Sequence, residues 1–144
     1  MDVYPPLLKL PDEAAYRESF DAIYCAGAVT TFDGITVRFQ KRDFDHCFFE
    51  SSQRNRIKDT FSNLRAERLE WIAVALQDAT AERFQGWDRD SKTYEKTRRV
   101  TLVCGNYVVV IALTGATSAR FITAYVADTP RTLAKLKTSP KWTP

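Results

Sequence analysis

Cysteine, histidine and glycine are scarce in this chain, and each scarcity excludes a class of function. The 144 residues include three cysteines, one histidine and five glycines. Cys25, Cys47 and Cys104 are odd in number and have no CxxC spacing, which argues against a disulfide framework and against a zinc ribbon. One histidine cannot supply a His-rich metal centre. We therefore expect no metal, no cofactor and a reducing, cytoplasmic environment.

Long apolar runs and common catalytic motifs are also missing. The longest apolar run, residues 107–113, is far shorter than a membrane-spanning helix, and no apolar leader follows the start of the chain. There is no glycine-rich phosphate loop, HExxH motif or nucleophile elbow. The length predicts a single domain over residues 1–144, with its core at about 12–137 and irregular ends at 1–11 and 138–144. We expect no membrane partner.

The positive charge is concentrated in two segments. The formal net charge is +3, yet residues 92–99 alone carry +3 and residues 129–144 carry +4 without an acidic side chain. The rest of the chain is therefore net acidic. Such an asymmetry favours a polyanionic partner such as RNA, although it is also common on ordinary protein surfaces.

Apolar spacing predicts helices first and strands later. Helices are expected over residues 12–26 and about 54–78, with a short basic helix over 130–137. Strands are expected near residues 35–40, 98–103, 107–113 and 120–127, with a loop or ragged hairpin over 79–96. The last three strands are joined by connections too short for parallel crossovers. This pattern predicts an α+β fold, in which two or more N-terminal helices pack on one face of a twisted, mainly antiparallel sheet of about four strands.

Alternation along the last strand predicts which residues are open to solvent. We expect Ile122, Ala124 and Val126 to face the core and Phe121, Thr123 and Tyr125 to lie on the open face.

The polar residues that are present suit RNA cleavage without a metal. In that reaction a base removes the ribose 2′-hydroxyl proton, cations and donors stabilise the anionic phosphorane, and an acid protonates the departing 5′-oxygen. His46 could be either the base or the acid. The second proton carrier would be Tyr125, Lys96 or a carboxylate.

Arginines and aromatic residues could hold the substrate. Arg65, Arg98 or Arg99 could bind the phosphate, and Thr123 could donate to a non-bridging oxygen. A base could stack on Trp87 or Tyr94.

Four segments taken together carry a family resemblance: FDHCFFES, LRAERLEWIAVAL, KTRRVTLVCGNYVVVIAL and FITAYVAD. The combination resembles phage and prophage nucleases of the barnase, EndoU, colicin-nuclease and RelE (BECR) fold group, over roughly residues 37–137. That group is known for two helices followed by a four-stranded antiparallel sheet whose exposed face cuts RNA without metal. Its phage branches resemble this chain in a Thr-Ala-Tyr triplet, in a histidine before the long helix and in an Arg on that helix. Together with the chemistry above, the resemblance implies catalytic roles for His46, Arg65, Thr123 and Tyr125 and substrate binding by Arg68, Lys96, Arg98, Arg99 and Trp87.

Two functions follow as hypotheses. The first is a phage- or toxin-associated metal-independent endoribonuclease that acts on transfer RNA or another RNA, in its own cytoplasm or in that of a target cell, and is neutralised by an immunity or antitoxin protein. The second is a non-catalytic phage or mobile-element protein of the same fold that binds a protein or nucleic acid through its basic sheet face.

Each candidate residue also has a purely structural interpretation. His46 could be a buried, hydrogen-bonded residue, and Thr123 and Tyr125 could be ordinary strand residues. Arg65 and Arg68 could pair with nearby acids on a solvated helix face. A nucleophilic pair of Cys47 and His46 is disfavoured, because neighbours on a strand point to opposite faces.

Overall fold

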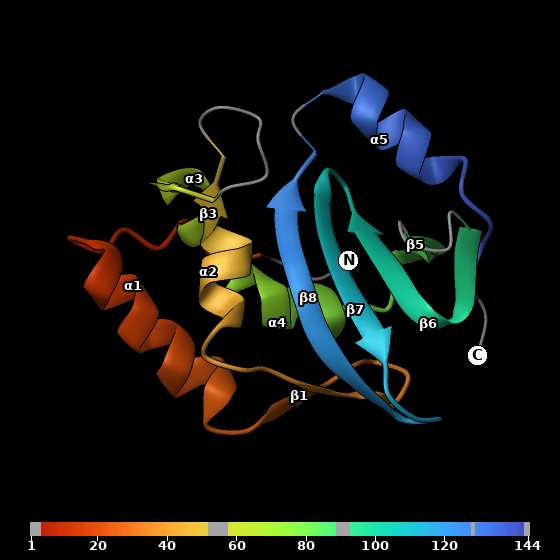
Figure 1. Ribbon diagram of the computed structural model, residues 1–144, viewed down its shortest axis with the longest axis horizontal. Coiled ribbons are helices and arrows are strands. Elements are labelled where there is room, and N and C mark those ends of the chain that lie inside the picture. The colour runs from red at the N-terminus through yellow and green to blue at the C-terminus, as the bar shows by residue number, and fades with distance from the viewer. Residues whose placement is uncertain (1–3, 52–57, 89–92, 128, 143–144) are drawn as a thin grey trace.

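The computed structural model describes residues 4–51, 58–88, 93–127 and 129–142, with residues 87, 88 and 93–98 described by their backbone alone. It is an α+β fold in which α-helices lie beside a mainly antiparallel sheet (Figure 1). The described helices are α1 (Glu13–Phe20), α2 (Asp43–Phe48), α3 (Asn63–Ala66), α4 (Trp71–Leu76) and α5 (Pro130–Lys137), and a π-helical segment, Asp21–Cys25, extends α1. The expected α+β class is confirmed.

The sheet has six strands rather than about four. Its order is β1 (Ala28–Thr30), β2 (Thr36–Arg38), β8 (Ser118–Val126), β7 (Tyr107–Leu113), β6 (Thr93–Cys104) and β5 (Glu82–Asp88). Strands β6, β7 and β8 form the expected antiparallel meander, whereas β2 pairs in parallel with β8. β5 and the beginning of β6 pair as an antiparallel hairpin whose register shifts between Gln85 and Gly86, so the ragged hairpin expected over residues 79–96 is confirmed for the described residues and the loop alternative is wrong. A further pair, β3 (Phe49–Glu50) and β4 (Thr60–Phe61), forms a separate small sheet.

The single helix expected over residues 54–78 is wrong for the described part of that range. Residues 60–61 form β4, and Ser62 then begins α3 by accepting a hydrogen bond from the Arg65 N–H. α4 follows after a short irregular stretch. The apolar spacing on which the prediction rested is kept only in part: Ile72, Ala75 and Leu76 are fully buried, whereas Leu64 is 55% exposed.

Aromatic side chains connect the helical elements to the sheet. Phe20 of α1 makes edge-on contacts with Phe39, Phe44 and Phe48 at ring-centroid distances of 5.8–6.1 Å. Phe39 stacks in turn on Phe121 of β8 at 4.8 Å. All of these rings belong to one buried cluster that also contains residues of the central strand β7. Such edge-on and offset ring pairs stabilise a core beyond the area that they bury.

The face assignment along β8 is wrong at Phe121, which is 1% exposed and lies in the core. Phe121 is opposite Ile111 and Thr123 is opposite Val110, so β8 has one extra residue, Ile122, at this point. Such a bulge reverses the alternation of the strand. Phe121 and Ala124 therefore both belong to the core cluster, although they are three residues apart.

The segment after α5 is more ordered than expected. Trp142 is 6% exposed, and its N–H donates to the Arg83 carbonyl at 3.1 Å. The Gln85 N–H of β5 donates to the Pro140 carbonyl at 2.8 Å. The tail thus runs beside β5 and closes that edge of the sheet.

The bulge makes a test of stability possible at adjacent positions. We expect Phe121→Ala to lower the free energy of unfolding by about 3–5 kcal/mol, because it removes a ring from the core. The exposed neighbour Arg120 supplies the control, since Arg120→Ala should change stability by less than about 0.5 kcal/mol. Urea denaturation of both variants measures the difference. Equal effects would show that Phe121 does not face the core.

Candidate functional site

A groove lies beside β8, beyond the point at which its parallel pairing with β2 ends. β2 pairs only with residues 118–120 at the beginning of β8. The chain then turns away through residues 39–42 and forms α2, which lies along β8 (Figure 1). The groove between these elements has a volume of about 430 Å³. A site at such an interruption can present both helix and strand side chains to one ligand.

Positive charge dominates the groove. Its lining comes from α2, from the segment before β4, from β6 and from β8: Arg42, Asp43, His46, Lys58, Arg99, Arg120, Phe121, Ile122 and Thr123. Four of these side chains are permanent cations near neutral pH, and one is a carboxylate. Within the described part of the chain, none of the four cations forms an ion pair with a carboxylate. The groove is therefore built to attract an anion.

Strand register places two of the arginines on one face. Arg99 is opposite Ala112, and Ala112 is opposite Arg120, so the two arginines stand in one row across three strands. Glycine at position 86 of β5 leaves room for Arg99 on the neighbouring strand β6, since a Cβ at Gly86 would lie only 2.4 Å from the Arg99 Cβ. Thr123 stands in the next row of the same face, opposite Val110. The bulge at Ile122 is what brings Thr123 to this face.

Asp43 and His46 are three residues apart on α2 and both line the groove. Asp43 is 7% exposed, and its Oδ2 accepts a hydrogen bond of 2.8 Å from the Gln40 N–H. Burial raises the pKa of this carboxyl, although the Gln40 N–H and the charges of Arg42, His46 and Arg120 oppose the shift. Asp43 is thus the counter-charge at the rim of a cationic site. His46 is exposed on the last turn of α2, so the expectation of a strand here, and the alternative of a buried histidine, are both wrong.

Lys58 is a residue of the groove that sequence reasoning missed. Its Nζ donates to the His46 carbonyl, which ties the segment before β4 to the end of α2. Loss of hydration, and secondly the charge of Arg65, lower the pKa of the Lys58 ammonium. Nothing in the local sequence distinguishes Lys58 from other surface lysines, because its partners come from elsewhere in the chain.

Arg65 and Tyr125 contact each other but lie outside the lining of the groove. The Arg65 guanidinium carbon is 5.8 Å from the centre of the Tyr125 ring. Arg65 also donates to the Cys47 carbonyl at 3.2 Å and pairs with Glu50 at 3.3 Å. Burial raises the pKa of the Tyr125 hydroxyl, and the charge of Arg65 only partly opposes this. Arg65 is therefore occupied by internal partners, and Tyr125 is a poor proton donor.

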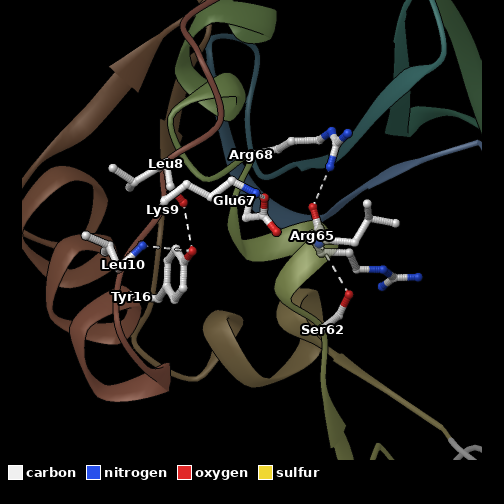
Figure 2. Close-up of polar contacts among 9 residues, drawn as sticks. Leu8, Lys9, Leu10, Tyr16, Ser62, Arg65, Glu67 and Arg68 are labelled. Carbon is white, nitrogen blue, oxygen red and sulfur yellow. Dashed lines mark hydrogen bonds and ion pairs between the residues drawn. The ribbon is translucent and has the colours of Figure 1, made fainter.

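Arg68 is directed away from the groove. Its Nη1 donates to the Leu64 carbonyl one turn earlier, at 2.6 Å, as Figure 2 shows beside the Ser62 cap of Arg65. Its guanidinium also lies 5.1 Å from the Trp71 ring centre. These contacts are those of a structural arginine.

The remaining predicted substrate-binding residues divide into two groups. Arg99 lines the groove. The side chains of Trp87, Tyr94, Lys96 and Arg98 lie outside the described part of the structure, and only their backbone in β5 and β6 is described.

Cys47 supports the groove from behind. It is fully buried, and its Sγ donates to the Ala124 carbonyl at 3.3 Å. Burial raises the pKa of the Cys47 thiol to about 11 and outweighs the hydrogen bonds at Ala124 and Thr123. A nucleophilic Cys47–His46 pair is therefore disfavoured by burial and by the thiol pKa, rather than by the geometry of a strand.

Two searches of the described residues gave negative results. No group of three or more His, Cys, Asp or Glu side chains there could hold a metal ion. No helix in that part of the chain is both long enough and apolar enough to cross a membrane.

Comparison of the chain with protein-family models, with curated proteins and with solved structures finds no match.

The environment of Cys47 can be tested by alkylation. A thiol whose pKa is about 11 has few thiolate anions near neutral pH, so iodoacetamide at about pH 8 should modify Cys47 at least tenfold more slowly in the native protein than in urea. Mass spectrometry of the peptides identifies the modified cysteine. Equal rates in both states would mean that the thiol is accessible and ionised.

Proposed function

We propose that the groove binds the RNA backbone and that the protein is a metal-independent endoribonuclease. The observation that carries the proposal is the convergence of four cations without carboxylate partners in the described structure on the same groove as His46 and Thr123. Phosphodiester oxygens are the chemical complement of that set. Guanidinium groups bind them with two parallel hydrogen bonds, and ammonium groups bind them as point charges.

The cations of the groove are placed to hold a phosphate in position before any bond is broken. Arg99 and Arg120 lie in one row of the sheet, so they would approach a phosphate from the strand side, while Arg42 would approach it from α2. Fixed donors of this kind stabilise the charge that develops on a phosphorane without reorganising. Arg120, Phe121 and Thr123 of the floor belong to residues of β8 that pair with β7, on either side of the bulge at Ile122.

The chemistry uses the ribose itself. The 2′-oxygen attacks the adjacent phosphorus, the bond to the 5′-oxygen breaks, and a 2′,3′-cyclic phosphate and a 5′-hydroxyl are formed. His46 lines the groove, and an imidazole can both accept and donate a proton in catalysis. Thr123 would donate its hydroxyl to a non-bridging oxygen. Because Arg65 and Tyr125 line no part of the groove, the proposal gives them no direct contact with the phosphate.

The proposal extends to fold group and context. The helical elements that share the core with the sheet would form one layer, and the face carrying Arg99, Arg120 and Thr123 would form the substrate side, as in the BECR group. A phage- or toxin-associated role in a cytoplasm, on transfer RNA or another RNA, rests on that resemblance alone. Such an enzyme would require an immunity or antitoxin partner.

A second candidate function is RNA or protein binding without cleavage. This function is favoured because two of the four residues expected to be catalytic, Arg65 and Tyr125, do not line the groove. Arg65 contacts the Cys47 carbonyl and Glu50 instead, and the pKa of the Tyr125 hydroxyl is raised. The same cationic groove would then serve binding alone.

Cleavage in the presence of EDTA tests the first function against the second. The purified protein should degrade total cellular RNA in EDTA, and His46→Ala should lower the rate by about 10²-fold or more, because a proton carrier is lost. Tyr125→Phe, which lies outside the groove, should cleave at nearly the normal rate. RNA that stays intact at high protein concentration would favour the binding function.

The salt dependence of binding tests the anion site whether or not cleavage occurs. A 2′-deoxy oligonucleotide, which cannot be cleaved by this chemistry, is the probe. Arg120→Gln should weaken binding and reduce the slope of log affinity against log salt by about 0.7, the value for one lost phosphate contact on a single strand. The matched control is Arg131→Gln, on the exposed side of α5. An unchanged slope for Arg120→Gln would place the backbone elsewhere.

A further inference from the structure

We propose that Lys58 is the general acid of the cleavage reaction, that His46 is consequently the base, and that Arg65 is a positioning residue for Lys58. The inference rests on the proposed ribonuclease function. It deepens that function by naming the second proton carrier of the same groove.

Lys58 is placed at the right site by two independent contacts. It lines the groove together with His46, Thr123 and the three arginines, and its Nζ donates to the His46 backbone carbonyl. The hydrogen bond holds the ammonium at the end of α2. An ammonium has three donors, so two N–H groups stay available for a leaving oxygen.

Arg65 completes the placement from behind the groove. Its own guanidinium is fixed by the Cys47 carbonyl, by Glu50 and by the face of Tyr125. Arg65 does not line the groove, so its effect on the reaction would come from its charge. Arg65 and Lys58 donate to the adjacent carbonyls of Cys47 and His46, so the two cations are neighbours and the charge of Arg65 acts on the Lys58 ammonium through space.

The charges around Lys58 act in opposite directions. Loss of hydration and the charge of Arg65 lower the pKa of Lys58, whereas Cys47 and Glu50 raise it by smaller amounts. Asp43, His46 and the arginines at positions 42, 99 and 120 face the same groove. The net lowering brings the ammonium closer to the proton affinity at which general acids are effective.

The other candidates for the acid are less suitable. Tyr125 does not line the groove, and burial raises the pKa of its hydroxyl. Asp43 lines it, but this carboxyl is 7% exposed and its Oδ2 is engaged by the Gln40 N–H at the start of α2. Lys58, by contrast, is exposed in the groove.

The reaction balances with these two groups. The neutral His46 imidazole takes the proton of the 2′-hydroxyl as the 2′-oxygen–phosphorus bond forms. The Lys58 ammonium gives a proton to the 5′-oxygen as the phosphorus–oxygen bond breaks. His46 ends protonated and Lys58 ends neutral, and exchange with water restores both.

A leaving-group substitution provides the test. The substrate is a short single-stranded RNA, compared with the same RNA in which sulfur replaces the scissile 5′-oxygen, because a thiolate leaves without protonation. Lys58→Arg keeps the charge but donates a proton poorly. It should cleave the oxygen substrate about 10²-fold more slowly and the sulfur substrate at nearly the normal rate. Binding of the 2′-deoxy oligonucleotide should change little.

The pH profile and two further variants complete the experiment. The descending limb of the wild-type profile should disappear in Lys58→Arg. In Arg65→Gln it should move to higher pH, because a charge that lowers the Lys58 pKa is gone, and Arg65→Lys should restore it. Lys135→Arg, on α5, is the matched control.

Each outcome decides a distinct claim. Equal impairment of Lys58→Arg on both substrates, or rescue by sulfur of Asp43→Asn instead, would overturn the assignment while leaving the ribonuclease function intact. A folded wild-type protein that cleaves neither substrate would overturn the proposed function and this assignment together.

Discussion

The stack of Phe39 on Phe121 is the contact on which the arrangement of this protein depends. It lies where β2 stops pairing with β8, at the end of the parallel ladder. Because Phe121 must face the core there, the strand needs its bulge at Ile122 to place Ala124 in the core as well. The same bulge turns Thr123 to the opposite face. One core contact therefore determines which polar groups of β8 reach the groove.

The end of β2 also determines what stands opposite those groups. A strand that continued along β8 would cover its edge with backbone, whereas α2 covers it with side chains. Arg42, Asp43 and His46 all enter the groove from this helix. Arg42 is brought close to Arg99 and Arg120, and their like charges repel, whereas Asp43 is a counter-charge among them. Phe44 and Phe48 of α2 belong to the buried aromatic cluster, which stabilises the helix at this position.

Local sequence patterns predict much of the fold but only part of the candidate site. The β6–β7–β8 meander and α5 have short connections or clear caps, so their periodicity is informative. The prediction of one long helix failed because residues 60–61 form β4 and Ser62 begins a new helix, although apolar residues recur at helical spacing through this segment. The parallel pairing of β2 with β8 joins segments far apart in the sequence, which periodicity does not report. β1 has three residues and β5 has an irregular register, so their local patterns are weak. His46, Arg99 and Thr123 were identified by their chemistry and do lie together. Lys58 and Arg120 were not, because only tertiary structure distinguishes them from other surface cations.

The positions of Arg65 and Lys58 show what residue type alone does not report about the groove. Arg65 has the better chemistry for binding phosphate, yet its Nε and Nη1 contact Glu50 and the Cys47 carbonyl. Lys58 has the poorer geometry for binding but lines the groove, and among the described residues its Nζ donates to the His46 carbonyl alone. A cation whose hydrogen bonds are made within the protein can still change the pKa of a neighbouring group through its charge, whereas a cation with N–H groups in the groove can contact a ligand directly. The distinction separates a group that sets the proton affinity of its neighbour from a group that exchanges the proton itself.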